Sequence, residues 1–256
     1  MSFFPIGDFH IESMKQASIF SNYLNLRVED VIVLLGDVIH FANSIWDISK
    51  DVPIEQKMEK IPEDVSIWET FIAGVRKPTI YYLGSHEMFG LRVISKLFPS
   101  LKPKINSAFV FLPSDLDLIP IGDKSNPLFI TGLHIPDNIH PNTKSKEFLA
   151  RKALIESWIS NKAKSLRLQG PTRTCLCTHD PTDSYYVNLG YTALTKMLQD
   201  YSLKVHYHAH IHSNIRETMI GKTPSVNRSF VALSRHRPEA LEPATPLLKS
   251  LYDRNV

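Results

Sequence analysis

Side chains that can bind metals or transfer protons recur at intervals along this chain. Aspartates and histidines directly follow short apolar segments at Asp8, His10, Asp37, His86, His179, His210 and His212. Apolar segments of this length predict strands, and the carboxyl ends of strands in an open α/β sheet border a common crevice. Imidazole and carboxylate together suit borderline divalent metals. The pattern therefore predicts a metal centre at the strand ends.

Each motif alone has an ordinary structural explanation. An Asp-x-His or Gly-Asp sequence after a strand is usually a turn in which the aspartate bonds to the backbone. An isolated histidine such as His179 is more often a hydrogen-bonded, half-buried side chain. His210 and His212 are more specific, because alternate residues of a strand share a face and can chelate one site. The prediction thus depends on the ordered set of motifs.

Taken together, the motifs resemble those of the calcineurin-like metallophosphoesterase superfamily. Its pattern is D-x-H, G-D, G-N-H-[DE], a single H and G-H-x-H. Here the blocks read, in the same order, Asp8-Phe9-His10, Gly36-Asp37, Gly84-Ser85-His86-Glu87, His179 and Ala209-His210-Ile211-His212. The resemblance implies an α/β fold in which two packed mixed β-sheets are flanked by helices, a four-layer α-β-β-α sandwich. We expect one such domain over residues 1–256.

The resemblance also implies two divalent metals and a role for each ligand. The first metal would be held by Asp8, His10 and His212, the second by His179, His210 and Ser85, with Asp37 bridging the two. Manganese is favoured, and iron, zinc, nickel or magnesium are alternatives. Two cations about 3.5–4 Å apart acidify a bridging water into hydroxide, which attacks phosphorus in line. His86 would assist beside the phosphoryl group as general acid or charge stabiliser.

Three positions depart from the family pattern. Ser85 replaces the asparagine whose carbonyl oxygen binds the second metal, so we expect that metal to be held more weakly. His40 replaces an acid that orients the catalytic histidine in many members, and Glu87 or Asp180 could substitute for it. Ala209 replaces a glycine, which is tolerable unless the backbone there needs a positive φ.

Further polar residues could line the pocket. His40, His134 and Asn227 are candidate substrate-binding residues, because each lies next to a predicted strand end or a predicted ligand. His206 and His208 extend the alternation of histidines that ends at His212. We expect these two to pack beneath the site as hydrogen-bonded core side chains.

Alternating apolar runs and amphipathic stretches predict the elements that carry these residues. The predicted strands are 2–7, 31–35, 79–83, 108–112, 116–121, 127–132, 173–178, 203–208 and one near 226–234. The predicted helices are 12–26, 65–76, 145–168 and 191–201. In the long helix, Leu149, Leu154, Trp158 and Ile159 are the expected core contacts. The expected pocket walls are loops at 40–65, 87–107 and 134–146.

Composition bounds the remaining possibilities. The 256 residues are 43% hydrophobic, and the formal net charge of +3 is too small to indicate nucleic acid or a membrane surface as a partner. Cys175 and Cys177 are too close together for a structural disulfide, which fits a reducing compartment. With no signal peptide or spanning segment visible, we expect a cytoplasmic protein that acts on a phosphorylated small molecule or, preferentially, a phosphodiester.

Two alternatives remain open. The departures at Ser85 and His40 allow an inactive scaffold of the same fold that acts in protein interaction. The basic segment 144–173, which includes Lys162 and Lys164, allows a nuclease. A solvated helix surface is the commoner explanation of such a segment, so a nucleic-acid substrate is not favoured.

Overall fold

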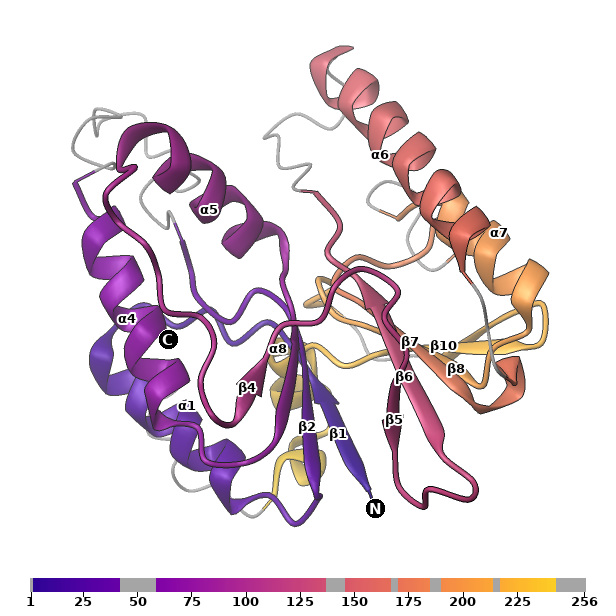
Figure 1. Ribbon diagram of the computed structural model, residues 1–256, viewed down its shortest axis with the longest axis horizontal. Helices are drawn as coiled ribbons and strands as arrows, with labels where there is room; N and C mark the ends of the chain where they lie inside the picture. The colour runs from indigo at the N-terminus through magenta and orange to yellow at the C-terminus, as the bar shows by residue number, and fades with distance from the viewer. Residues whose placement is uncertain are drawn as a thin grey trace.

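The computed structural model describes residues 2–41, 59–136, 146–166, 170–184, 190–213 and 217–242. Two β-sheets lie at its centre (Figure 1). The first sheet has the order β1-β2-β3-β4 and is parallel throughout. Its strands are β1 Phe3–Ile6, β2 Val31–Leu35, β3 Thr79–Tyr82 and β4 Val110–Phe111.

The second sheet is mixed and has the order β5-β6-β7-β8-β10-β9. Its strands are β5 Ile119–Ile121, β6 Leu128–Leu133, β7 Thr174–Thr178, β8 Val205–His208, β9 Glu217–Ile220 and β10 Thr223–Asn227. Strands β6, β7, β8 and β10 are parallel to one another, while β5 and β9 pair antiparallel at the two edges. The parallel strands of each sheet therefore end on one side.

Helices cover the outer face of each sheet (Figure 1). The first sheet packs against α1 Met14–Leu26, α4 Ile61–Gly74, α5 Ser85–Leu97 and α8 Phe230–His236. The second sheet packs against α6 Lys146–Ser165 and α7 Thr192–Tyr201. Short 3-10 helices are η1 Pro171–Arg173 and η2 Pro238–Leu241. The predicted fold class, two sheets flanked by helices, is confirmed.

Strand β2 shows why the two sheets stay together. All five of its residues are buried, because alternate side chains point to opposite faces. Ile32 and Leu34 belong to the core under the helices, whereas Val31, Val33 and Leu35 belong to the core between the sheets. Burying each such side chain stabilises the fold by about 1.5–3 kcal/mol. The continuous apolar run correctly predicted a strand buried on both faces.

Two sequence predictions about elements are wrong, and one strand was missed. The strand expected near 226–234 ends at Asn227, and the helix α8 follows, because the Ser229 hydroxyl caps it by accepting a hydrogen bond from the Ala232 N–H at 3.4 Å. The expected loop at 87–107 begins with the helix α5. Strand β9 was not predicted at all.

The core-facing side of α6 was also predicted wrongly in part. Leu149 and Leu154 are 54% and 73% exposed. The buried residues are instead Phe148, Ile155 and Ile159, which recur at helical spacing. The apolar stripe thus lies beside the two leucines, and only Ile159 and the partly buried Trp158 meet the expectation.

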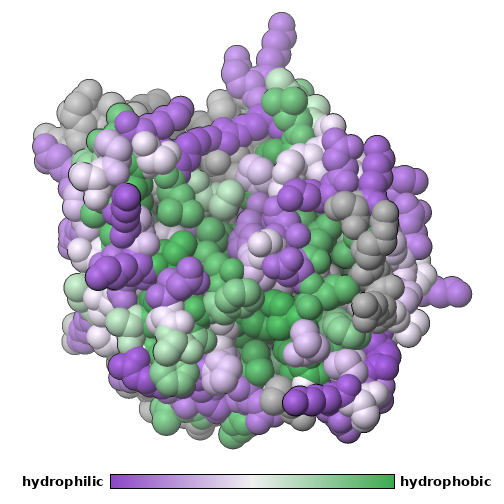
Figure 2. Space-filling view, in the orientation of Figure 1, coloured by the Kyte–Doolittle hydropathy of each residue, from purple (hydrophilic) through white to green (hydrophobic). Residues whose placement is uncertain are grey.

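The surface offers two further features. Hydrophobic residues gather across the middle of the face shown in Figure 2, and Phe111 on the edge strand β4 is among the exposed apolar side chains. None of the helices in the described ranges is long and apolar enough to cross a bilayer.

Candidate metal centre

The predicted ligands gather in two groups at the carboxyl ends of the parallel strands. Atoms of Asp8, His10 and His212, here called the Asp8 group, all lie within 4.8 Å of one another. Atoms of Asp37, His179 and His210, the Asp37 group, meet the same limit. Asp8 follows β1, Asp37 follows β2 and His179 follows β7. The tertiary fold therefore brings together side chains that are up to about two hundred residues apart in the chain.

Sharp turns aim these side chains into the site. Asp8, His10, Asp37 and His210 all have positive φ, at 58°, 49°, 47° and 64°. This left-handed conformation is uncommon for residues other than glycine, although Asp and His adopt it more readily than most. Held by the surrounding structure, it costs on the order of 1 kcal/mol or more at each residue, and such strain concentrates at functional sites.

Close approach of two loops places Asp37 beside the start of α5. A Cβ atom at Gly36 would lie 2.3 Å from the Gly84 Cα, and a Cβ at Gly84 would lie 2.4 Å from the Asp37 backbone N. Neither position can therefore carry a side chain without moving the other loop. Ala209 is accommodated in a related way, since its methyl group packs where Gly7 has no side chain. The positive φ falls on His210 rather than on Ala209.

The Asp8 group has a buried carboxylate without donors. The His10 Nε2 lies 3.1 Å from the His212 Nε2, and the latter lies 3.5 Å from the Asp8 Oδ2. Neither oxygen of Asp8 has a hydrogen-bond partner among the described residues. Burial raises the pKa of Asp8 by more than His212 and His179 lower it. A buried carboxylate is costly unless it is paired, so a cation suits this group.

The Asp37 group is richly hydrogen bonded. The Asp37 Oδ1 accepts a hydrogen bond from the His86 backbone N–H at 2.8 Å, and the Oδ2 accepts one from the Ser85 hydroxyl at 3.0 Å. The His179 Nε2 lies 3.0 Å from the same Oδ2. Burial would raise the pKa of Asp37, but His179 and His86 outweigh burial and hold it well below its usual value.

The two histidines of the Asp37 group are directed at a common point. The His179 Nε2 and the His210 Nδ1 are 2.9 Å apart. The His179 Nδ1 lies 2.9 Å from the carbonyl oxygen of Leu35. Because that oxygen can only accept, the Nδ1 carries a proton and the Nε2 is the nitrogen available to a metal. Metal-binding histidines commonly use their second nitrogen in this way, so a metal also suits this group.

Glu87 holds the two loops of the Asp37 group together. Its Oε2 accepts hydrogen bonds from the backbone N–H groups of Asp37 and Gly84, and its Oε1 accepts one from Ile39, each at 2.9 Å. Burial, followed by the charge of Asp37, raises the pKa of Glu87 to about 7. The sequence suggested Glu87 as a partner of His86, whereas the structure gives it the role of bracing the ligand loops.

His86 is oriented by a main-chain group. Its Nδ1 lies 3.1 Å from the carbonyl oxygen of Phe41, so this nitrogen donates, and its Nε2 lies 3.8 Å from the Asp37 Oδ2. Burial is the largest influence on the pKa of His86 and lowers it. His40, the residue in the place of the family's acid, instead has its Nδ1 3.0 Å from the Glu12 Oε1.

Neither Glu12 nor the Phe41 carbonyl was predicted from the sequence as a partner of these histidines. The sequence did carry a signal for Glu12, because Asp8, His10 and Glu12 alternate along the chain. Nothing in the sequence could have indicated the Phe41 carbonyl, since every residue has one. The tertiary fold determines which carbonyl oxygen accepts the hydrogen bond from the imidazole of His86.

The other candidate substrate-binding residues have structural partners. The His134 Nδ1 accepts a hydrogen bond from the Leu83 N–H at 3.0 Å, and its Nε2 lies 2.8 Å from the carbonyl oxygen of Pro113. The buried Asn227 donates to the carbonyl oxygen of Ile211 at 2.6 Å and accepts from the Ser229 N–H at 3.0 Å. These contacts favour positioning of nearby backbone over direct substrate binding.

The prediction that His206 and His208 pack beneath the site is confirmed, because both are fully buried. The His206 Nε2 lies 2.8 Å from the Thr178 Oγ1, and its Nδ1 lies 2.9 Å from the Ser225 Oγ. The Thr178 hydroxyl in turn donates to the carbonyl oxygen of Asp180 at 2.6 Å. This chain of hydrogen bonds joins three strands and fixes the turn that carries His179.

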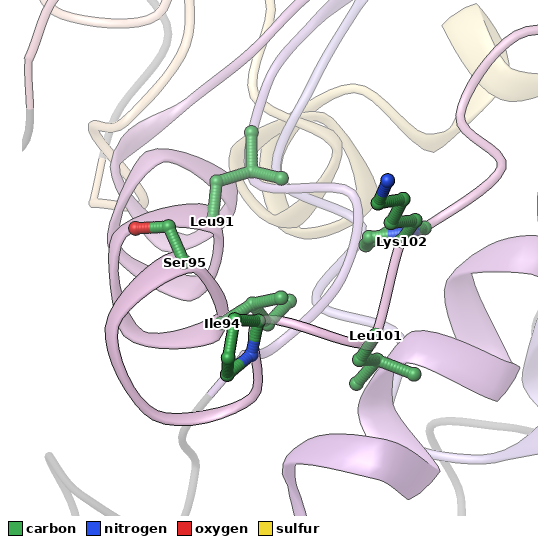
Figure 3. A pocket seen from close by; sticks show the side chains of 7 residues that line it. Leu91, Ile94, Ser95, Leu101 and Lys102 are labelled. Carbon is green, nitrogen blue, oxygen red and sulfur yellow. The ribbon is translucent and has the colours of Figure 1, made fainter.

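A pocket of about 410 Å³ lies elsewhere, against the later turns of α5 (Figure 3). It is lined by Leu91, Ile94, Ser95, Pro99, Leu101, Lys102 and Pro103. None of the predicted metal ligands is among these residues. The predicted ligands at the strand ends therefore do not line this pocket.

Comparisons with known proteins give a family match and solved structures of similar fold. The family model of the calcineurin-like phosphoesterases matches residues 1–214. A phosphopantetheinyl hydrolase from Mycobacterium tuberculosis is 13% identical, with 95% of this chain and 97% of that chain covered and a TM-score of 0.54. A dimetal phosphatase from Danio rerio is 12% identical, with 91% and 88% covered and a TM-score of 0.48. No curated protein matches in sequence. At such low identity the structural likeness concerns the fold.

Proposed function

Because the chain belongs to the calcineurin-like phosphoesterase family, we propose that it hydrolyses phosphodiesters with two divalent metals. The observation that carries the proposal is the buried Asp8 carboxylate, which makes no close hydrogen bond within the described part of the chain and faces the imidazoles of His212 and His179. A monoester is the alternative substrate class. Manganese is the metal we propose, since mixed imidazole and carboxylate ligands suit it as well as iron, zinc or nickel.

The two groups divide the ligands between the metals. Asp8, His10 and His212 would hold the first, and His179 and His210 the second, with Asp37 between them. When bound, such a metal pair supplies a water of lowered pKa and neutralises charge on the phosphoryl oxygens. The backbone N–H of His86 and the Ser85 hydroxyl fix the orientation of the Asp37 carboxylate. The protein therefore sets the geometry of the bridging ligand in advance.

His86 is the residue we propose to assist at the phosphoryl group. Its Nδ1–H is engaged by the Phe41 carbonyl, so its Nε2 is directed toward the ligand groups. Burial favours the neutral imidazole, in which the Nε2 carries a lone pair. To donate a proton to a leaving group, the ring must first gain one, and the Phe41 carbonyl supports the charged form less than a carboxylate would.

Ser85 makes the second metal the weaker one in this proposal. Its hydroxyl donates to Asp37, and a neutral hydroxyl is a poorer metal ligand than the amide oxygen that the family pattern places there. Three ligands of the Asp37 group remain in place. We therefore expect activity with the second metal in faster exchange than the first.

The test is hydrolysis of bis-p-nitrophenyl phosphate beside p-nitrophenyl phosphate with added Mn²⁺. A phosphopantetheinyl ester extends the panel, because the solved structure of similar fold carries that name. Metal-dependent turnover that is faster for the diester supports the proposal. Folded protein that turns over neither compound with Mn²⁺, Ni²⁺ or Fe²⁺ would contradict it.

The hydrogen bond between Ser85 and Asp37 also supports a second candidate, a scaffold of the same fold that acts in protein interaction. Elemental analysis separates the two. A scaffold would carry no transition metal after purification and take up none on titration, whereas the proposed enzyme would bind metal through the Asp8 group.

A nuclease is less well supported. Lys162 of the basic segment pairs with Asp115 at 3.0 Å, and Lys144 and Arg167 lie outside the described residues. If nucleic acid is cleaved, replacing Lys162, Lys164 and Arg167 together should lower that cleavage while leaving hydrolysis of the small diester unchanged.

A further inference from the structure

Three imidazoles form a second cluster that shares His10 with the Asp8 group. The ring centroids of His10, His40 and His86 lie 5.2, 5.1 and 4.8 Å apart, so they form a nearly equilateral triangle. One ring nitrogen from each lies within 4.8 Å of the others. All three side chains are partly exposed. This partial exposure distinguishes them from the buried pair His206 and His208.

Two of the three rings have one nitrogen already engaged by an acceptor. The His40 Nδ1 is 3.0 Å from the Glu12 carboxylate, and the His86 Nδ1 is 3.1 Å from the Phe41 carbonyl. In the neutral rings these nitrogens are the donors, and each Nε2 carries the lone pair. A carboxylate or backbone carbonyl on the far nitrogen is the usual outer partner of a metal-binding histidine. The cluster has this arrangement twice.

We propose that His40 and His86, with His10 as a shared third ligand, form an additional binding position for a divalent metal. Neutral imidazoles suit zinc, copper or nickel better than magnesium or calcium, so zinc is the ion we assign. Two carboxylates limit the charge that accumulates there, because Glu12 contacts His40 and the Asp37 Oδ2 lies 3.8 Å from the His86 Nε2.

His10 ties this position to the Asp8 group, of which it is also a member. A neutral imidazole binds a metal through only one nitrogen while the other carries the proton. When His10 binds the metal of the Asp8 group, the additional position keeps His40 and His86 as its protein ligands, so it should fill after the others and more weakly.

An inhibitory effect of zinc follows, and this step rests on the proposed function. Zinc at the additional position would occupy the His86 Nε2, the nitrogen that we propose to face the phosphoryl group. Excess zinc should then lower the hydrolysis rate of a Mn²⁺-loaded enzyme, and a chelator-buffered return to low zinc should restore it.

The direct test measures bound zinc and needs no turnover. The full chain is dialysed against increasing free zinc, and the bound equivalents are measured by elemental analysis. His40→Asn is the informative variant, since its amide can still donate to Glu12 but offers no ring nitrogen to a metal. His236→Ala is the matched control, because His236 is an exposed histidine bonded to the Ser213 carbonyl.

We expect His40→Asn to lose about one equivalent, the weakest, while its tighter equivalents and its melting temperature match those of wild type and His236→Ala. If His40→Asn binds as much zinc as wild type, or loses a tight equivalent instead of the weakest, the additional position does not exist. His40→Gln repeats the measurement should the asparagine variant melt early. Because bound zinc is the readout, a failure of the proposed hydrolysis would not be mistaken for a failure of this inference.

Discussion

The Asp8 group and the Asp37 group contain the same residue types but are held in different ways. The Asp37 carboxylate accepts hydrogen bonds from a backbone N–H and a serine hydroxyl and lies against His179. The buried Asp8 carboxylate has no such donor among the described residues, and His212 beside it is 40% exposed. One carboxylate is oriented by close hydrogen bonds, whereas the oxygens of the other lie 3.5 and 3.6 Å from the imidazole nitrogens of His212 and His179.

This difference indicates how the site could assemble. Opposite charges and donors hold the pKa of Asp37 well below its usual value, so this carboxylate is ionised before any metal arrives. Burial raises the pKa of Asp8, and a carboxylate must be deprotonated to bind a metal. The Asp37 group is therefore the more preorganised of the two, and the Asp8 carboxylate is the one that a bound cation should stabilise more.

The largest effect should come from the shared ligand. Asp37→Asn removes the negative charge that we propose offsets the repulsion between the two metals, so kcat/KM for bis-p-nitrophenyl phosphate should fall by roughly a thousandfold, equivalent to about 4 kcal/mol. Steady-state kinetics with Mn²⁺ measure it. Asp200→Asn, at an exposed helix position paired with Lys196, is the control and should change little. If the two variants have comparable activity, Asp37 is not a metal ligand.

Metal removal should expose the dependence of Asp8 on a cation. A metal at about a hundred times its Kd stabilises the fold by about 2.7 kcal/mol. Chelation should therefore lower the melting temperature of the wild type by roughly 5–10 °C. Asp8→Asn should respond less, and without metal it should melt no lower than metal-free wild type, because the unpaired charge is gone. A chelated Asp8→Asn protein that melts well below chelated wild type would show that Asp8 has another partner.

The next largest effect should come from Glu87, whose hydrogen bonds join the two ligand loops. Glu87→Gln replaces a carboxylate that accepts three backbone hydrogen bonds by an amide with one acceptor oxygen and a donor. We expect a loss of about 2 kcal/mol in the free energy of unfolding, measured by urea denaturation of the metal-free protein. Glu156→Gln is a useful comparison, because Glu156 accepts two backbone hydrogen bonds at the start of α7, from Thr192 and Ala193, and neither of these residues belongs to the ligand loops. Metal affinity should fall in the first variant only.

The smallest effect should come from Ser85, beside the second metal position. Ser85→Asn restores an amide oxygen next to Asp37 and should tighten the weaker metal by about tenfold, measured by competition with a chelator. Ser85→Ala, which removes the hydroxyl without adding a ligand, should give no gain. Equal affinity in the two variants would mean that Ser85 is not the weak ligand.

The order of the motifs determined the family from sequence alone, because each motif is local and its residues need only be adjacent in the chain. Local pattern also determined β2, whose unbroken apolar run requires burial on both faces. The same kind of reasoning failed for α6, where a stripe centred on Phe148, Ile155 and Ile159 differs from the predicted one by a small rotation of the helix. The hydrophobic residues predicted that this segment is a helix, but they did not predict which side of the helix faces the core.

Only the tertiary structure decided which atoms meet within the site. The sequence placed Asp8 and Asp37 in equivalent positions after strands, yet the donors around Asp37 come from α5, some fifty residues later. Likewise, His86 meets the Phe41 carbonyl and not the His40 ring nitrogen. Hydrogen bonds depend on distance and direction to within fractions of an ångström, and those are fixed by the packing of two sheets and their helices. The sequence predicted which residues are ligands, whereas the packing determined that Asp37 and Asp8 have different hydrogen-bond partners.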